Sequence, residues 1–150
     1  MKKLTALLLA VLLVFGLAAC AGSPAESNAK PGDTMTLQDI LTSITKDVAD
    51  LPDTETTALT KDNFEYFAFT AMPDGVEAIA ADALINAVPQ DAETAMKLAA
   101  DVEANLNPAK WVCVEAEKTA VLVHNCTVLL VMSWSDVTDA LTANFNALWS

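Results

Sequence analysis

The chain has 150 residues, of which 20 are acidic and 8 are basic, and its formal net charge is −12. A surface this acidic repels nucleic-acid phosphates, so the composition argues against a nucleic-acid-binding protein. The apolar share of 53% is too high for a disordered chain and predicts a folded domain with its own core.

The first residues have the pattern of an export signal. Lys2 and Lys3 precede an almost wholly apolar run over residues 4–17. Fourteen helical residues would span roughly 21 Å, which is shorter than the roughly 30 Å hydrocarbon core of a bilayer. A positive start, a short apolar run and small residues at its end are typical of a cleaved signal peptide.

The end of this run, Leu17-Ala18-Ala19-Cys20, resembles the lipobox of bacterial lipoproteins. The resemblance implies that residues 1–19 are removed and that Cys20 becomes a lipidated N-terminus, which anchors the chain to the outside of the cell membrane. Six basic residues then remain against all 20 acidic ones, an excess of 14 negative charges. Residues 20–35 are small, polar and interrupted by Pro24, Pro31 and Gly32, so we expect a flexible tether.

A single domain is predicted over residues 36–150. Its first element is an amphipathic helix over residues 36–52, with a capping-box-like start at Thr36 and Asp39 and a stop at Pro52. Its apolar face recurs at helical spacing and comprises Leu37, Ile40, Leu41, Ile44, Val48 and Leu51.

The middle of the domain predicts two strands and a second helix. Residues 63–71 alternate aromatic and apolar residues with others, as strands do. Residues 75–89 are interpreted as one further strand, although their alanines would also permit a helix. Residues 90–108 predict a helix that starts near Asp91 and ends at Asn107-Pro108. The apolar face of that helix comprises Ala92, Ala95, Met96, Ala99, Val102 and Leu106.

The last third predicts a hairpin and a final helix. Residues 120–123 and 127–132 are the expected strands, with His124-Asn125-Cys126 at the turn. The final helix would be capped by Ser133, Ser135 or Asp136 and would bury Val137, Leu141, Phe145 and Leu148.

The elements thus follow the order α-β-β-α-β-β-α. Strands joined by hairpins and followed by helices favour an α+β fold, with an antiparallel sheet of about four strands and helices packed mostly on one face.

The order of these elements, the lipobox, Leu51-Pro52, the aromatic segment Phe64-Glu65-Tyr66-Phe67 and the acidic helix start at Asp91 resemble the lipoproteins that carry domain of unknown function 4358. Where that family's pattern would place Gly-Asn before the last strand, this chain has His124-Asn125. The resemblance covers residues 36–149 and implies a compartment and a fold. It supplies no catalytic residue.

Cys113 and Cys126 are the only thiols after Cys20. Outside the cytoplasm the two could form a disulfide, and two buried free thiols are the alternative.

Few residue patterns point to chemistry. His124 and Cys126 could form a nucleophile pair or, with Cys113, a metal site, but an ordinary turn is the better interpretation. Asp50, Asp53 and Glu55 lack calcium-loop spacing. We therefore expect no catalytic residue, metal or cofactor that the sequence can identify.

Trp111, Trp134 and Trp149 flank the predicted strands and end the last helix. Aromatic residues at such places usually form core edges, but two exposed together would indicate a surface for a partner or a glycan.

The favoured function is a non-enzymatic binding module of the cell envelope, which contacts the membrane through the anchor at Cys20 and binds an envelope protein or peptide. The alternative is an envelope hydrolase or other enzyme whose carboxylates converge only in the fold.

Overall fold

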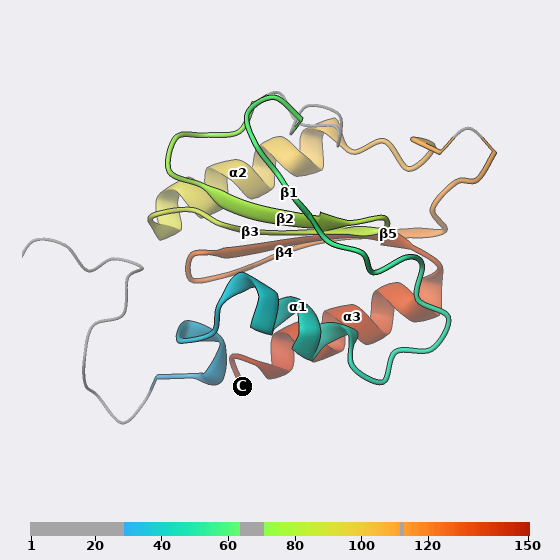
Figure 1. Ribbon diagram of the computed structural model, residues 1–150, viewed down its shortest axis with the longest axis horizontal. Coiled ribbons are helices and arrows are strands. Elements are labelled where there is room, and N and C mark those ends of the chain that lie inside the picture. Colours follow the sequence, from blue (N-terminus) through green and yellow to red (C-terminus); the bar gives the residue numbers. More distant parts are fainter. Residues whose placement is uncertain (1–28, 64–70, 112) are drawn as a thin grey trace, which may run out of the picture.

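A computed structural model describes residues 29–63, 71–111 and 113–150. The signal segment and Cys20 lie outside these ranges, as does nearly all of the strand predicted over residues 63–71. Within them the fold is α+β, as the sequence predicts (Figure 1). The elements in chain order are η1 (Pro31–Asp33), α1 (Leu37–Thr45), β1 (Thr57–Ala58), β2 (Glu77–Ala81), β3 (Leu84–Val88), α2 (Ala92–Asn105), β4 (Lys118–His124), β5 (Thr127–Ser133) and α3 (Ser135–Ala147).

The strands form one antiparallel sheet in the order β1-β2-β3-β5-β4. It has five strands where the sequence predicts about four, because residues 75–89 supply two strands and residues 57–58 form the additional short strand β1. The strand β5 is buried along its whole length and lies between β3 and β4, so it is the centre of the core.

Helices cover both faces of the sheet. Two of the three described helices, α1 and α3, lie on one face, and α2 lies on the other (Figure 1). Alternate residues of β5 supply the two cores, with Leu129 and Val131 facing α1 and α3, and Val128 and Leu130 facing α2. None of the helices in the described ranges is long and apolar enough to cross a membrane.

The first helix begins where the sequence predicts, after Thr36, but it ends at Thr45, before the predicted stop at Pro52. Thr36 accepts a hydrogen bond from the backbone N–H of Asp39 (3.2 Å), and the Asp39 carboxylate accepts from Thr36, which completes the capping box. The predicted helix over residues 36–52 is wrong after Thr45, since Asp47 and Asp50 adopt positive φ angles of 60° and 55°. Such angles interrupt a right-handed helix.

The predicted single strand over residues 75–89 is also wrong. It is a hairpin of β2 and β3, which pair from Glu77↔Val88 to Ala81↔Leu84, with Asp82 and Ala83 as the turn. The apolar run is long because both strands lie in the sheet between helices. Of its polar residues Glu77, Asp82 and Asn86, only Asp82 lies in the turn.

The second helix is capped at Asp91, as predicted, through a hydrogen bond from the Thr94 N–H to the Asp91 carboxylate (2.7 Å). The face of this helix that is buried differs in part from the apolar face that the sequence predicts. Leu98 is in the core, while Met96 is 61% exposed and Ala92 is exposed.

The ordered domain includes part of the predicted tether. Gly32 is buried, and its backbone N–H donates to the Leu148 carbonyl after α3 (2.9 Å). The Trp149 indole N–H donates to the Asp33 carboxylate (2.9 Å). Residues 31–33 therefore pack against the end of α3, and a flexible tether cannot extend through residue 35.

Candidate functional site

The structure brings Trp111 and Trp134 together in the lining of one cavity of about 260 Å³, here called the tryptophan hollow. It lies where the β2–β3 turn, the segment between α2 and β4, and the end of β5 meet. Its polar lining residues are Asp82, Glu115 and Ser133, and its apolar lining residues are Pro52, Ala83, Trp111, Val114, Ala116, Met132 and Trp134.

Much of this apolar lining is exposed. Trp134 is 43% exposed and Val114 is 60% exposed, which makes them two of the three large exposed apolar side chains among the described residues. Ligand sites are typically concave and apolar with a few polar groups, and the tryptophan hollow has that composition.

Hydrogen bonds to the β2–β3 turn fix two of the residues that line the hollow. The Trp111 indole N–H donates to the Asp82 carboxylate (3.1 Å), which fixes the orientation of the ring. The Met132 N–H donates to the Ala83 carbonyl (2.8 Å), so the end of β5 is fixed to the same turn. The prediction of a single strand over residues 75–89 leaves no place for this turn, although Asp82, a polar residue near the middle of the run, could indicate it.

A second cavity of about 300 Å³ lies beside the tryptophan hollow and shares Asp82 and Trp111 with it. Its lining also includes Glu55 and Lys110. The Lys110 ammonium lies 4.6 Å above the centroid of the Trp111 ring and donates to the Asp82 carbonyl (3.2 Å). Burial lowers the pKa of Lys110, and the nearby Asp82 charge partly opposes that shift.

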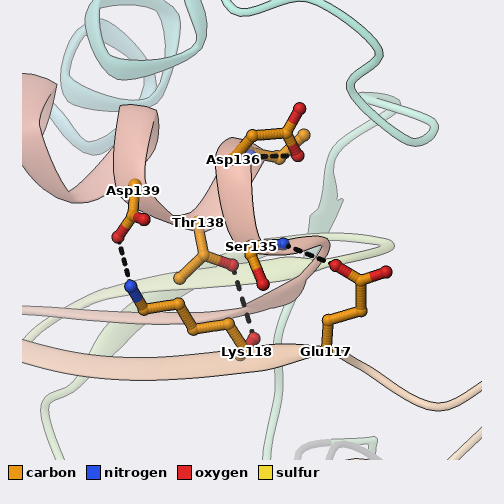
Figure 2. A network of polar contacts seen from close by, with 7 residues as sticks. Glu117, Lys118, Ser135, Asp136, Thr138 and Asp139 are labelled. Carbon is orange, nitrogen blue, oxygen red and sulfur yellow. Dashed lines mark hydrogen bonds and ion pairs between the residues drawn. The ribbon is translucent and has the colours of Figure 1, made fainter.

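Next to the hollow, Glu117 caps α3 from a distant part of the chain. The Ser135 N–H donates to the Glu117 carboxylate (3.1 Å), as Figure 2 shows. Trp134 is the N-cap residue and makes no side-chain cap hydrogen bond, so none of the predicted residues Ser133, Ser135 and Asp136 is the N-cap. The Asp136 carboxylate, in the first turn, still accepts a hydrogen bond from the Val137 N–H (2.9 Å). Ser133 instead ends β5, and its hydroxyl is buried without a hydrogen-bond partner among the described residues.

The same network includes two further contacts in Figure 2. Lys118 forms an ion pair with Asp139, and the Thr138 hydroxyl donates to the Lys118 carbonyl (3.3 Å). These contacts join the start of β4 to the first turns of α3, and so they support the wall of the hollow that Trp134 occupies.

The interpretation of His124-Asn125-Cys126 as an ordinary turn is confirmed. His124 ends β4, and Cys126 is buried in the two-residue turn that follows. The His124 ring stacks on Trp149, with centroids 4.9 Å apart, and its Nε2 lies 2.7 Å from the Asn146 amide oxygen. His124 and Trp149 are thus parts of the contact between the N-terminal segment and α3.

Cys113 is a free, exposed thiol, so the structure contains no bond between Cys113 and Cys126. The alternative of two buried free thiols is also wrong, because Cys113 is exposed in the segment between α2 and β4.

The described ranges contain no group of three His, Cys, Asp or Glu side chains arranged to hold a metal ion. In the acidic segment of residues 50–55, the Asp53 carboxylate accepts a hydrogen bond from the Glu55 N–H (2.9 Å), which is an ordinary turn contact.

No family model matches the chain, and no curated protein or solved structure is significantly similar to it. The resemblance to the lipoproteins with domain of unknown function 4358 stays a prediction.

Proposed function

We propose that the protein is a lipid-anchored, extracytoplasmic binding module that holds its ligand in the tryptophan hollow. The observation that carries the proposal is the meeting of Trp111 and Trp134 in one apolar cavity, with Trp134 43% exposed. Large aromatic side chains dominate the binding energy of many interfaces, because they bury much apolar area at small entropic cost.

The sequence supports the proposed lipid anchor. The apolar run over residues 4–17 and the lipobox-like ending at Cys20 support export and lipidation. Two or three acyl chains hold a protein stably on a membrane, whereas one chain binds only marginally. A binding domain anchored in this way would bind a ligand in the cell envelope.

The enzyme alternative gains no support from the described residues. In the part of the chain that the structure describes, the pKa values of the carboxyl groups of Asp33, Asp74 and Asp91 are lowered. A general acid would need a raised pKa, and none of these three residues lines the tryptophan hollow.

Cross-linking on intact cells, followed by capture of the protein and mass spectrometry, tests the proposal. We expect a partner that is enriched with the wild-type chain and lost with Trp134→Ala. Met96→Ala is the matched control, because Met96 is an exposed apolar residue on α2, away from the hollow.

A Cys20→Ala chain tests the anchor in the same experiment and should leave the membrane fraction. A partner captured equally by wild type and Trp134→Ala would contradict binding at the hollow. Membrane retention of the Cys20→Ala chain would contradict lipid anchoring at that residue.

A further inference from the structure

The charge around the tryptophan hollow is predominantly negative. Asp82 and Glu115 line it, and Glu55 lines the adjoining cavity. Among the described residues that line the two cavities, Lys110 is the one basic residue. The chain after Cys20 carries an excess of 14 negative charges, so its field adds to the attraction for a cation.

The protein already holds an ammonium group beside this hollow. Lys110 lies over the Trp111 ring and donates to the Asp82 carbonyl at 3.2 Å. Aromatic faces attract cations, and oxygen acceptors complete the coordination of an ammonium. Lys110 thus occupies the Trp111 face at this corner, and the carboxylates that line the hollow are the groups left to attract a basic ligand.

The hollow also requires an apolar group. Its lining is mostly apolar, and its volume of about 260 Å³ is small. Sites for drug-sized ligands are typically about 300–1,000 Å³. A volume below that range suits one or two side chains of a longer segment.

Building on the proposed function, we propose that the tryptophan hollow binds a basic peptide segment of an envelope protein. An apolar side chain of the segment fills the hollow against Trp111 and Trp134, and flanking lysine or arginine side chains meet Asp82 and Glu115. An acidic segment would be repelled by the same two carboxylates.

The test uses the full lipidated chain in phosphatidylcholine nanodiscs, with the tryptophan indole groups labelled with ¹⁵N. Three capped peptides serve as probes: Lys-Phe-Leu-Lys, Glu-Phe-Leu-Glu and Lys-Ser-Ser-Lys. We expect the first to shift the indole signals of Trp111 and Trp134, and to bind at least about tenfold more tightly than the other two, a ratio that corresponds to about 1.4 kcal/mol.

Trp149 is an internal control in the same spectrum. It lies after the end of α3, while the hollow lies at the start of that helix, about 20 Å away for a helix of 13 residues. Its indole signal should not move. Added salt should weaken binding of the basic peptide, because its attraction to exposed carboxylates is screened.

Two variants with matched controls separate the apolar and ionic contributions to peptide binding. Trp134→Ala should abolish the shift of the Trp111 signal, whereas Met96→Ala should not. Glu115→Gln should weaken binding of the basic peptide about two- to fivefold, as expected for the loss of one exposed charge pair. Glu77→Gln removes a carboxylate at the opposite end of β2 from Asp82 and should change nothing.

Equal binding of the basic and acidic peptides at Trp134 would overturn the inference about charge and leave the hollow as a binding site. If no peptide binds the folded protein but a neutral N-acetylglucosamine oligomer does, the ligand is a glycan and the peptide inference is wrong. If none of these probes binds, the inference is overturned, while the proposed function is judged separately by the cellular cross-linking.

Discussion

At the residue scale, Asp33 is the centre of the contact between the N-terminal segment and the domain. Its carboxylate accepts hydrogen bonds from the Trp149 indole and from the Asn125 side chain. Trp149 stacks in turn on His124 and contacts Phe145. These contacts determine where the chain leaves the domain toward the proposed anchor.

Gly32 is required at this contact because Trp149 lies directly against it. A Cβ atom added at Gly32 would lie 2.3 Å from a carbon of the Trp149 ring, so the ring would have to move. We expect Gly32→Ala to lower the free energy of unfolding by about 1–3 kcal/mol, as overpacking usually does. Urea denaturation measures this, and Thr34→Ala, at an exposed neighbouring position, should change it little.

The charge of Asp33 predicts a pH dependence. Burial would raise the pKa of Asp33, but hydrogen bonds from the Lys30 N–H, Trp149 and Asn125, together with nearby His124, outweigh burial and lower it. A lowered pKa stabilises the fold above the ordinary value of about 3.9, and this stabilisation is lost as the pH falls through the folded-state pKa.

Wild type should therefore be more stable than Asp33→Asn at pH 6, and the difference should shrink below about pH 4, the ordinary range of an aspartate pKa. Urea denaturation of both proteins between pH 3 and pH 6 measures the difference. A difference that does not change over this range would contradict the assigned role of the charge.

At the element scale, the starts of the first two helices can be predicted from neighbouring residues in the sequence. The features that the sequence does not predict depend on contacts between residues far apart in the chain. The capping box of Thr36 and Asp39 and the cap at Asp91 depend on residues within one turn, so the sequence contains them. The acceptor at the start of α3 is Glu117, which precedes β4. No local pattern around Ser135 could indicate it.

The Glu117 contact predicts a measurable stability effect. Removing the carboxylate leaves the Ser135 N–H without its acceptor and removes a negative charge from the N-terminus of α3. We expect Glu117→Ala to cost about 0.5–2 kcal/mol, the range for lost helix caps. Thermal unfolding measures the change, and Glu115→Ala in the same segment is the control; equal losses in both variants would contradict the capping role.

At the scale of the whole molecule, the α+β class follows from the alternation of strand-like and helix-like segments. The sequence could not predict the candidate site, because Trp111 and Trp134 are separated by the β4–β5 hairpin and meet only when that hairpin forms. Periodicity identifies which side chains are apolar. It does not say which of them meet at the end of the sheet.

We propose that the anchored protein binds its ligand through the tryptophan hollow. The most direct measurement places a photo-crosslinking amino acid at position 114 or at position 96 of the chain in living cells. Val114, in the hollow, and Met96, on α2, are 60% and 61% exposed, so the two positions differ in place and not in accessibility. We predict a discrete cross-linked product from position 114 and none from position 96; the same products from both positions, or a product from position 96 alone, would contradict the claim.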